Sequence, residues 1–127
     1  MRKTIIFTVM LFTLLYVGQA VGGESGGYFE SGSRLNERMQ ADNRVLERKA
    51  DGGDGIDSGY VLGYIMGVTD TLLSLKVLCL PESVKKGQIV DVVKKYLKDH
   101  PEQRHYSGVD LVAEALTPTF SCKGRAR

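Results

Sequence analysis

The chain is poor in the residues on which most catalytic and metal sites depend. It has two cysteines, Cys79 and Cys122, and two histidines, His100 and His105. The histidines have no evident third ligand beside them and their spacing fits no zinc pattern, so we predict no metal and no cofactor. No serine lies in a nucleophile-elbow pattern, and a disulfide would consume both thiols. We therefore predict no catalytic residue and no enzymatic activity.

Excess charge and strand periodicity are also missing. Lys and Arg number 17 against 15 Asp and Glu, and two of the positive residues, Arg2 and Lys3, lie in the first few positions. A balanced chain without a basic stripe lacks the electrostatic footprint of nucleic-acid binding, so we exclude nucleic acid as a partner. We find no internal repeat and no convincing run of alternating apolar and polar residues, and 127 residues allow one small domain.

The first twenty residues have the three-part plan of a secretory signal peptide. Arg2 and Lys3 are followed by an apolar stretch over residues 5–17 and by the small-residue site Gly18-Gln19-Ala20. The apolar stretch is shorter than the roughly 20 residues that cross a bilayer. We expect residues 1–20 to be a cleaved signal peptide that delivers a protein without a membrane span to the periplasm.

Export into an oxidising compartment favours a disulfide between Cys79 and Cys122, because an exported pair of cysteines usually joins. The bond would close a loop of about 43 residues, for which chain entropy gives on the order of 4 kcal/mol.

Four helices account for the remaining pattern, so the predicted fold class is all-α, a small four-helix domain with one intramolecular disulfide. Residues 21–57 are predicted to form a flexible arm and a weak first helix over 34–49. The apolar stripe of this helix is sparse, so we expect it to contact the core without contributing much to it. The helical core covers residues 58–122, with helices over 58–78, over 86–99 and from Ser107 to about Pro118. Residues 123–127 form a short basic tail.

The second predicted helix has an unusual glycine face. Gly59, Gly63 and Gly67 stand four residues apart, so they share one side of the helix. Missing side chains let another backbone approach closely, and we expect a neighbouring helix to pack there. Asp70 is the single acid within this apolar helix, and such a group is usually paired or placed at a wet edge.

Taken in order, several segments resemble the Rap/Tai family of type VI secretion immunity proteins. The segments are GYVLG at 59–63, GVTD at 67–70, CLP at 79–81, GQ at 87–88, VVKKYL at 92–97, HP at 100–101, His105, LVAEAL at 111–116 and FSC at 120–122. The resemblance implies a small helical periplasmic protein, often a homodimer, that binds a peptidoglycan amidase effector and occludes its active site. It also implies structural roles for the disulfide pair and for motif residues Gly59, Tyr60, Gly63, Gly67, Asp70 and Pro81.

The chain departs from the family pattern in its cysteines. Many members have a second cysteine pair, whereas this chain has Met39 in its first predicted helix and no cysteine before the glycine motif, so we expect that helix to be looser.

In the amidase branch of the family, a protruding loop of the immunity protein enters the enzyme's cleft. Our candidate for that loop is residues 99–106, which carry the predicted partner-binding residues His100, Glu102, Arg104, His105 and Tyr106.

Two other readings stay open at this point. A periplasmic chaperone or stress-response binding protein would also be a small helical, disulfide-containing domain, and would suppress client aggregation at acidic pH. An enzyme acting on the wall or on a lipid lacks a catalytic constellation in this sequence, and turnover of muropeptides by the pure protein would be needed to support it.

Overall fold

The chain forms helices α2 (Gly32–Leu46), α3 (Asp54–Ser74), α4 (Lys86–Asp99) and α5 (Gly108–Phe120), with a short 3-10 helix, η1 (Pro101–Gln103), before α5. This computed structural model describes residues 29–122, and within that range the fold contains these helices and no strand. The predicted all-α class is confirmed. The predicted signal peptide, most of the predicted arm and the basic tail lie outside the described residues.

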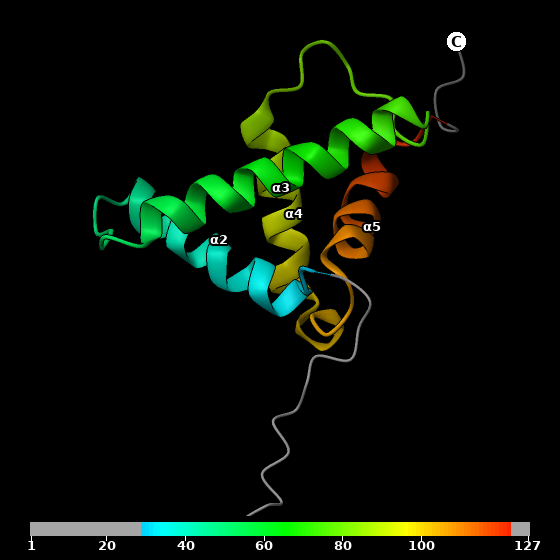
Figure 1. Ribbon diagram of the computed structural model, residues 1–127. Coiled ribbons are helices and arrows are strands. Elements are labelled where there is room, and N and C mark those ends of the chain that lie inside the picture. The colour runs from blue at the N-terminus through cyan, green and yellow to red at the C-terminus, as the bar shows by residue number, and fades with distance from the viewer. Residues whose placement is uncertain (1–28, 123–127) are drawn as a thin grey trace, which may run out of the picture.

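The helices surround one apolar core. Figure 1 shows α2 and α3 as a hairpin, with α3 crossing in front of α4 and ending beside α5. Each helix contributes apolar side chains to a single buried cluster, and so does the connection after α3. The cluster consists of Leu35, Met39, Val61, Ile65, Leu78, Ile89, Val90, Val93, Leu97, Leu111, Val112, Ala115, Leu116 and Phe120. No helix within residues 29–122 is long and apolar enough to cross a membrane.

Helix α2 corrects the prediction of a weak first helix over 34–49. Leu35 is fully buried and Met39 is 3% exposed, so its stripe belongs to the core although it is sparse. The helix begins at Gly32, where the Ser31 hydroxyl accepts a hydrogen bond from the Arg34 amide. It ends before the predicted position because Arg48 adopts a left-handed backbone, with φ of 57°. The helix is therefore part of the core, and its expected looseness stays a prediction.

Helix α3 is shifted four residues toward the N-terminus from the prediction of 58–78. The Asp51 carboxylate accepts hydrogen bonds from the amides of Gly53 and Asp54, at 3.0 and 3.2 Å, which starts the helix at the predicted loose joint. At the other end, Lys76 adopts a φ of 57°, and this left-handed turn follows the end of the helix at Ser74.

Helices α4 and α5 follow their predictions closely. Helix α4 spans the predicted residues and buries Ile89, Val93 and Leu97 on one face. Ser107 caps α5, because its hydroxyl accepts a hydrogen bond from the Asp110 amide at 3.2 Å. The helix runs two residues past Pro118, which lies in its last turn.

Candidate functional site

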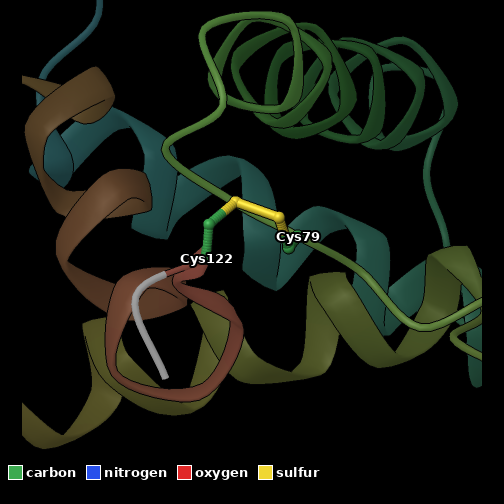
Figure 2. The surroundings of a disulfide bond; sticks show 2 residues. All are labelled: Cys79 and Cys122. Atoms are coloured by element: carbon green, nitrogen blue, oxygen red, sulfur yellow. A yellow bond between two sulfur atoms is a disulfide. The ribbon is translucent and has the colours of Figure 1, made fainter. Parts of the chain in front are cut away.

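The disulfide fixes the connection between α3 and α4. Cys79 and Cys122 are bonded, with their Cα atoms 4.9 Å apart, which confirms the predicted pairing. Figure 2 shows the bond joining the segment after α3 to the end of α5. Two backbone hydrogen bonds flank it, from the Cys79 amide to the Phe120 carbonyl at 2.7 Å and from the Cys122 amide to the Val77 carbonyl at 3.3 Å. The connection is therefore anchored on one side of the core.

The predicted binding loop, residues 99–106, is bonded through its backbone to the start of α2. The Ser33 amide donates to the Arg104 carbonyl at 2.7 Å, and the Gly32 amide donates to the Tyr106 carbonyl at 2.9 Å. A Cβ on Gly32 would lie 2.2 Å from a Leu111 side-chain carbon and 2.9 Å from the Arg104 carbonyl oxygen. Only glycine fits this contact, so α2 and the loop approach each other closely.

Two of the five predicted partner-binding side chains take part in packing within the chain. The His100 ring stacks on Tyr96, with ring centroids 4.2 Å apart. The Arg104 Nε donates to the Leu97 carbonyl at 2.8 Å, which satisfies an otherwise unbonded group in the last turn of α4. Both side chains are half-buried.

The other three predicted residues, Glu102, His105 and Tyr106, are exposed. Tyr106 keeps 51% of its surface accessible, and its ring lies 4.1 Å from that of His105. The His105 Nδ1 lies 2.9 Å from the Glu102 carbonyl oxygen, which holds the imidazole against the 3-10 turn. The fold therefore places a small polar and aromatic surface at this corner, supported by a rigid backbone.

Tyr96 links this loop to α5. Its hydroxyl lies 2.7 Å from a Glu114 carboxylate oxygen and 2.6 Å from the Gln103 side-chain oxygen. Burial, together with the hydrogen bond to Glu114, raises the pKa of Tyr96 to about 12. The phenol therefore keeps its proton at neutral pH and acts as a structural donor.

A second polar cluster joins α2 to α3. Arg44 forms a bidentate pair with Asp54, whose side chain is almost fully buried. The hydrogen bond from Arg44 is the main reason that the pKa of Asp54 falls from 3.8 to about 2. One turn further along α3, Asp57 accepts a hydrogen bond from the Arg38 guanidinium at 2.6 Å. The same guanidinium lies 4.1 Å from the centroid of the Tyr60 ring. These pairs fix the α2–α3 hairpin.

The glycine motif of α3 corrects the prediction of close helix packing. Gly59, Gly63 and Gly67 are exposed, and apart from adjacent residues and the backbone of α3 itself, a Cβ built on any of them would meet no atom of the described chain within 4 Å. Asp70 is exposed beside them, as expected for an acid at a wet edge. The sequence did carry a signal for this outcome, because Asp70 and Ser74 fall on the same side of the helix as the glycines and do not continue an apolar face.

Within residues 29–122, no group of three or more His, Cys, Asp and Glu side chains is arranged to hold a metal ion. The described residues do present two exposed surfaces. One surrounds the Tyr106 ring, and the other is a groove of about 340 Å³ beside the glycines of α3. Surfaces of this kind suit the binding of another protein.

No curated protein gives a significant match to the chain. The family model for Rap1a immunity proteins does match, over residues 31–122, which include helices α2 to α5 and both cysteines. The match begins at the N-cap of α2, so it includes the helix that was predicted to be weak because its apolar stripe is sparse. The chain belongs to the family of Rap1a immunity proteins.

Proposed function

We propose that this protein is a periplasmic immunity protein that binds a type VI secreted peptidoglycan amidase and blocks its active site. The observation that carries the proposal is the family match over residues 31–122, since immunity proteins act by binding an effector. The protein itself performs no chemistry in this account. It acts by covering the active-site cleft of the effector.

Two features of the chain support action outside the cytoplasm. Residues 1–20 have the plan of a cleavable leader, and the Cys79–Cys122 disulfide is the form expected in an oxidising compartment. An amidase that cuts peptidoglycan finds its substrate in the periplasm. A protein that neutralises it has to reach the same compartment.

The exposed corner around Tyr106 is our candidate for the inhibitory surface. Its backbone is held to α2 by short hydrogen bonds, so binding requires little ordering of the loop. Tyr106 presents half of its aromatic surface, with Glu102 and His105 beside it. Tyrosine is enriched at binding hot spots because one rigid ring buries a large area.

The test uses purified protein and an amidase effector encoded beside its gene. The proposal predicts that muropeptide release from peptidoglycan stops at a stoichiometric ratio of the two proteins, with a complex recovered by gel filtration. The variant Tyr106→Ala is expected to weaken inhibition at least about tenfold, whereas Leu46→Ala, at an exposed site at the other end of α2, is expected to inhibit normally. Full cleavage of the wall in the presence of excess folded protein would reject the proposed activity.

We also propose that the protein is a homodimer. This part of the proposal is separate from inhibition, because one protomer can bind an effector with or without a second copy. It is tested by the mass of the protein in solution.

A further inference from the structure

A groove of about 280 Å³ lies where the end of α2, the middle of α3 and the first half of α4 meet. Its walls are mainly apolar, with Leu46 from α2, Leu62 and Met66 from α3, and Val90 from α4. Leu62 and Met66 are one turn apart, so both face the groove from the same side of α3. Leu46 and Leu62 are exposed to solvent at its border.

A buried carboxylate lies in this apolar wall. Asp42 lines the groove and is only 5% exposed. It accepts a hydrogen bond from the Ser58 hydroxyl at 2.6 Å, and no other hydrogen bond or ion pair from residues 29–122 reaches its side chain. A carboxylate can accept about four hydrogen bonds, and buried charges are normally paired. Asp42 therefore has acceptor capacity left for a cationic group that enters the groove.

Positive charge lies on the α4 side of the same groove. Lys86 and Lys94 both line it, together with Asp91, which is exposed. Lys94 is half-buried, and its ammonium donates to the side chain of Asn43, the residue next to Asp42, and not to Asp42 itself. Lys86 is exposed, and no hydrogen bond or ion pair within residues 29–122 engages its ammonium. The groove thus combines a buried acid with two ammonium groups around an apolar wall.

We propose that this groove binds a small zwitterion, an α-amino acid with an apolar side chain. The ammonium of the ligand donates to Asp42, its carboxylate accepts from Lys86 and Lys94, and its side chain contacts Leu62 and Val90. An alkylamine would meet the two lysines without a partner for them, and a fatty acid would meet Asp42, whereas a zwitterion complements both signs of charge. Drug-sized ligands occupy pockets of roughly 300–1,000 Å³, so the volume of this groove suits a smaller molecule.

The first test compares three probes of similar shape on the full exported protein. They are L-leucine, 3-methylbutylamine, which is leucine without its carboxylate, and 4-methylpentanoate, which is leucine without its ammonium. Isothermal titration calorimetry is expected to show millimolar or tighter binding of leucine. Each analogue is expected to bind at least about tenfold more weakly, because it lacks one of the charge-assisted hydrogen bonds. Leucine should shift the amide NMR signals of residues 42–46, 62–66 and 86–94 most strongly.

Variants with matched controls assign the two charges. Asp42→Asn removes the charge and keeps the shape, whereas Ser58→Ala removes the hydrogen bond to Asp42 and keeps its charge. Leucine is expected to bind at least about tenfold more weakly to Asp42→Asn and close to normally to Ser58→Ala. Lys86→Met should also weaken binding, whereas Lys98→Met, at an exposed lysine of α4 that does not line the groove, should not. Circular dichroism checks each fold, and the variants of exposed lysines decide the case if Asp42→Asn unfolds.

Several results would overturn the proposal. Absence of leucine binding to folded wild type at millimolar concentration would remove the site. Equal affinity for leucine and 3-methylbutylamine would make it a cation site, and equal affinity for leucine and 4-methylpentanoate would make it an anion site. NMR shifts confined to residues outside the groove would overturn its location. None of these results bears on inhibition of an amidase, so this proposal and the proposed function fail independently.

Discussion

Arg104 holds the last turn of α4, because its Nε donates a hydrogen bond to the Leu97 carbonyl oxygen at 2.8 Å. The residue is half-buried, and its own carbonyl accepts from the Ser33 amide. The only arginine of the predicted binding loop, Arg104, is therefore a structural brace between α4 and α2. The neighbouring side chain of Tyr106 remains half exposed, so the two residues should respond differently to mutation.

We predict that Arg104→Ala lowers the free energy of unfolding by about 1.5–3 kcal/mol, since it removes a charge-assisted hydrogen bond to a helix end. Tyr106→Ala should change stability by no more than about 0.5 kcal/mol, because half of the residue's surface is in solvent and its side chain braces no helix end. Urea unfolding of the two variants distinguishes these effects. Equal losses of stability in both variants would contradict the division of roles within the loop.

Burial of α2 gives a prediction with a matched control on the same helix. Leu35 is fully buried, whereas Leu46 is 71% exposed. Leu35→Ala should cost about 2–5 kcal/mol of unfolding free energy through lost apolar contact and a residual cavity. Leu46→Ala should cost less than about 0.5 kcal/mol. If urea unfolding gives the same midpoint for both, α2 is the peripheral helix that its sparse apolar pattern indicated.

Removal of the disulfide should weaken the fold without changing its helices. The bond closes a sequence separation of 43 residues, which corresponds to about 4 kcal/mol in the loop-entropy model. The double variant Cys79→Ser with Cys122→Ser is expected to unfold at a lower urea concentration, and wild type in dithiothreitol should shift by a similar amount. An unchanged midpoint in both experiments would show that the cross-link adds no stability.

Acid should weaken the α2–α3 hairpin through Asp54. The pKa of Asp54 falls from its ordinary value of 3.8, which applies in the unfolded chain, to about 2 in the folded protein. The carboxylate therefore contributes stability that is present above pH 3.8 and is lost as the pH falls toward about 2. We predict that Asp54→Asn lowers the melting temperature at pH 6 and flattens its decline between pH 4 and pH 2. Asp70→Asn, at an exposed acid on the same helix, is the control.

Thermal melts of the three proteins at several pH values check this assignment. An acid-dependent loss of stability that is as steep in Asp54→Asn as in wild type would place the responsible carboxylate elsewhere.

Local signals made part of the fold predictable. The amphipathic repeat of Ile89, Val93 and Leu97 defined α4, and Ser107 with Asp110 marked the start of α5. The ends of α3 were not predicted correctly, because they depend on two local features of the backbone. The Asp51 carboxylate accepts hydrogen bonds from the amides of Gly53 and Asp54, and Lys76 adopts a left-handed backbone. Neither feature changes the spacing of apolar residues from which helices are predicted.

Tertiary arrangement decided the rest. A sparse stripe such as Leu35 and Met39 becomes core only when another helix covers it, and α3 covers this one. The reverse holds for Gly59, Gly63 and Gly67, whose spacing suits close packing but which no neighbour within the described chain contacts. For the binding loop, sequence located the segment, but the inward hydrogen bond of Arg104 depends on where α4 ends.

The most direct test of the account is survival of bacteria that express the amidase effector in the periplasm together with this protein, made either with or without residues 1–20. The account predicts that only the form with the leader rescues growth, and that the rescued cells yield a complex of the two proteins. Equal rescue by the leaderless form, or death of cells that contain soluble, oxidised and exported protein, would contradict periplasmic immunity by direct binding.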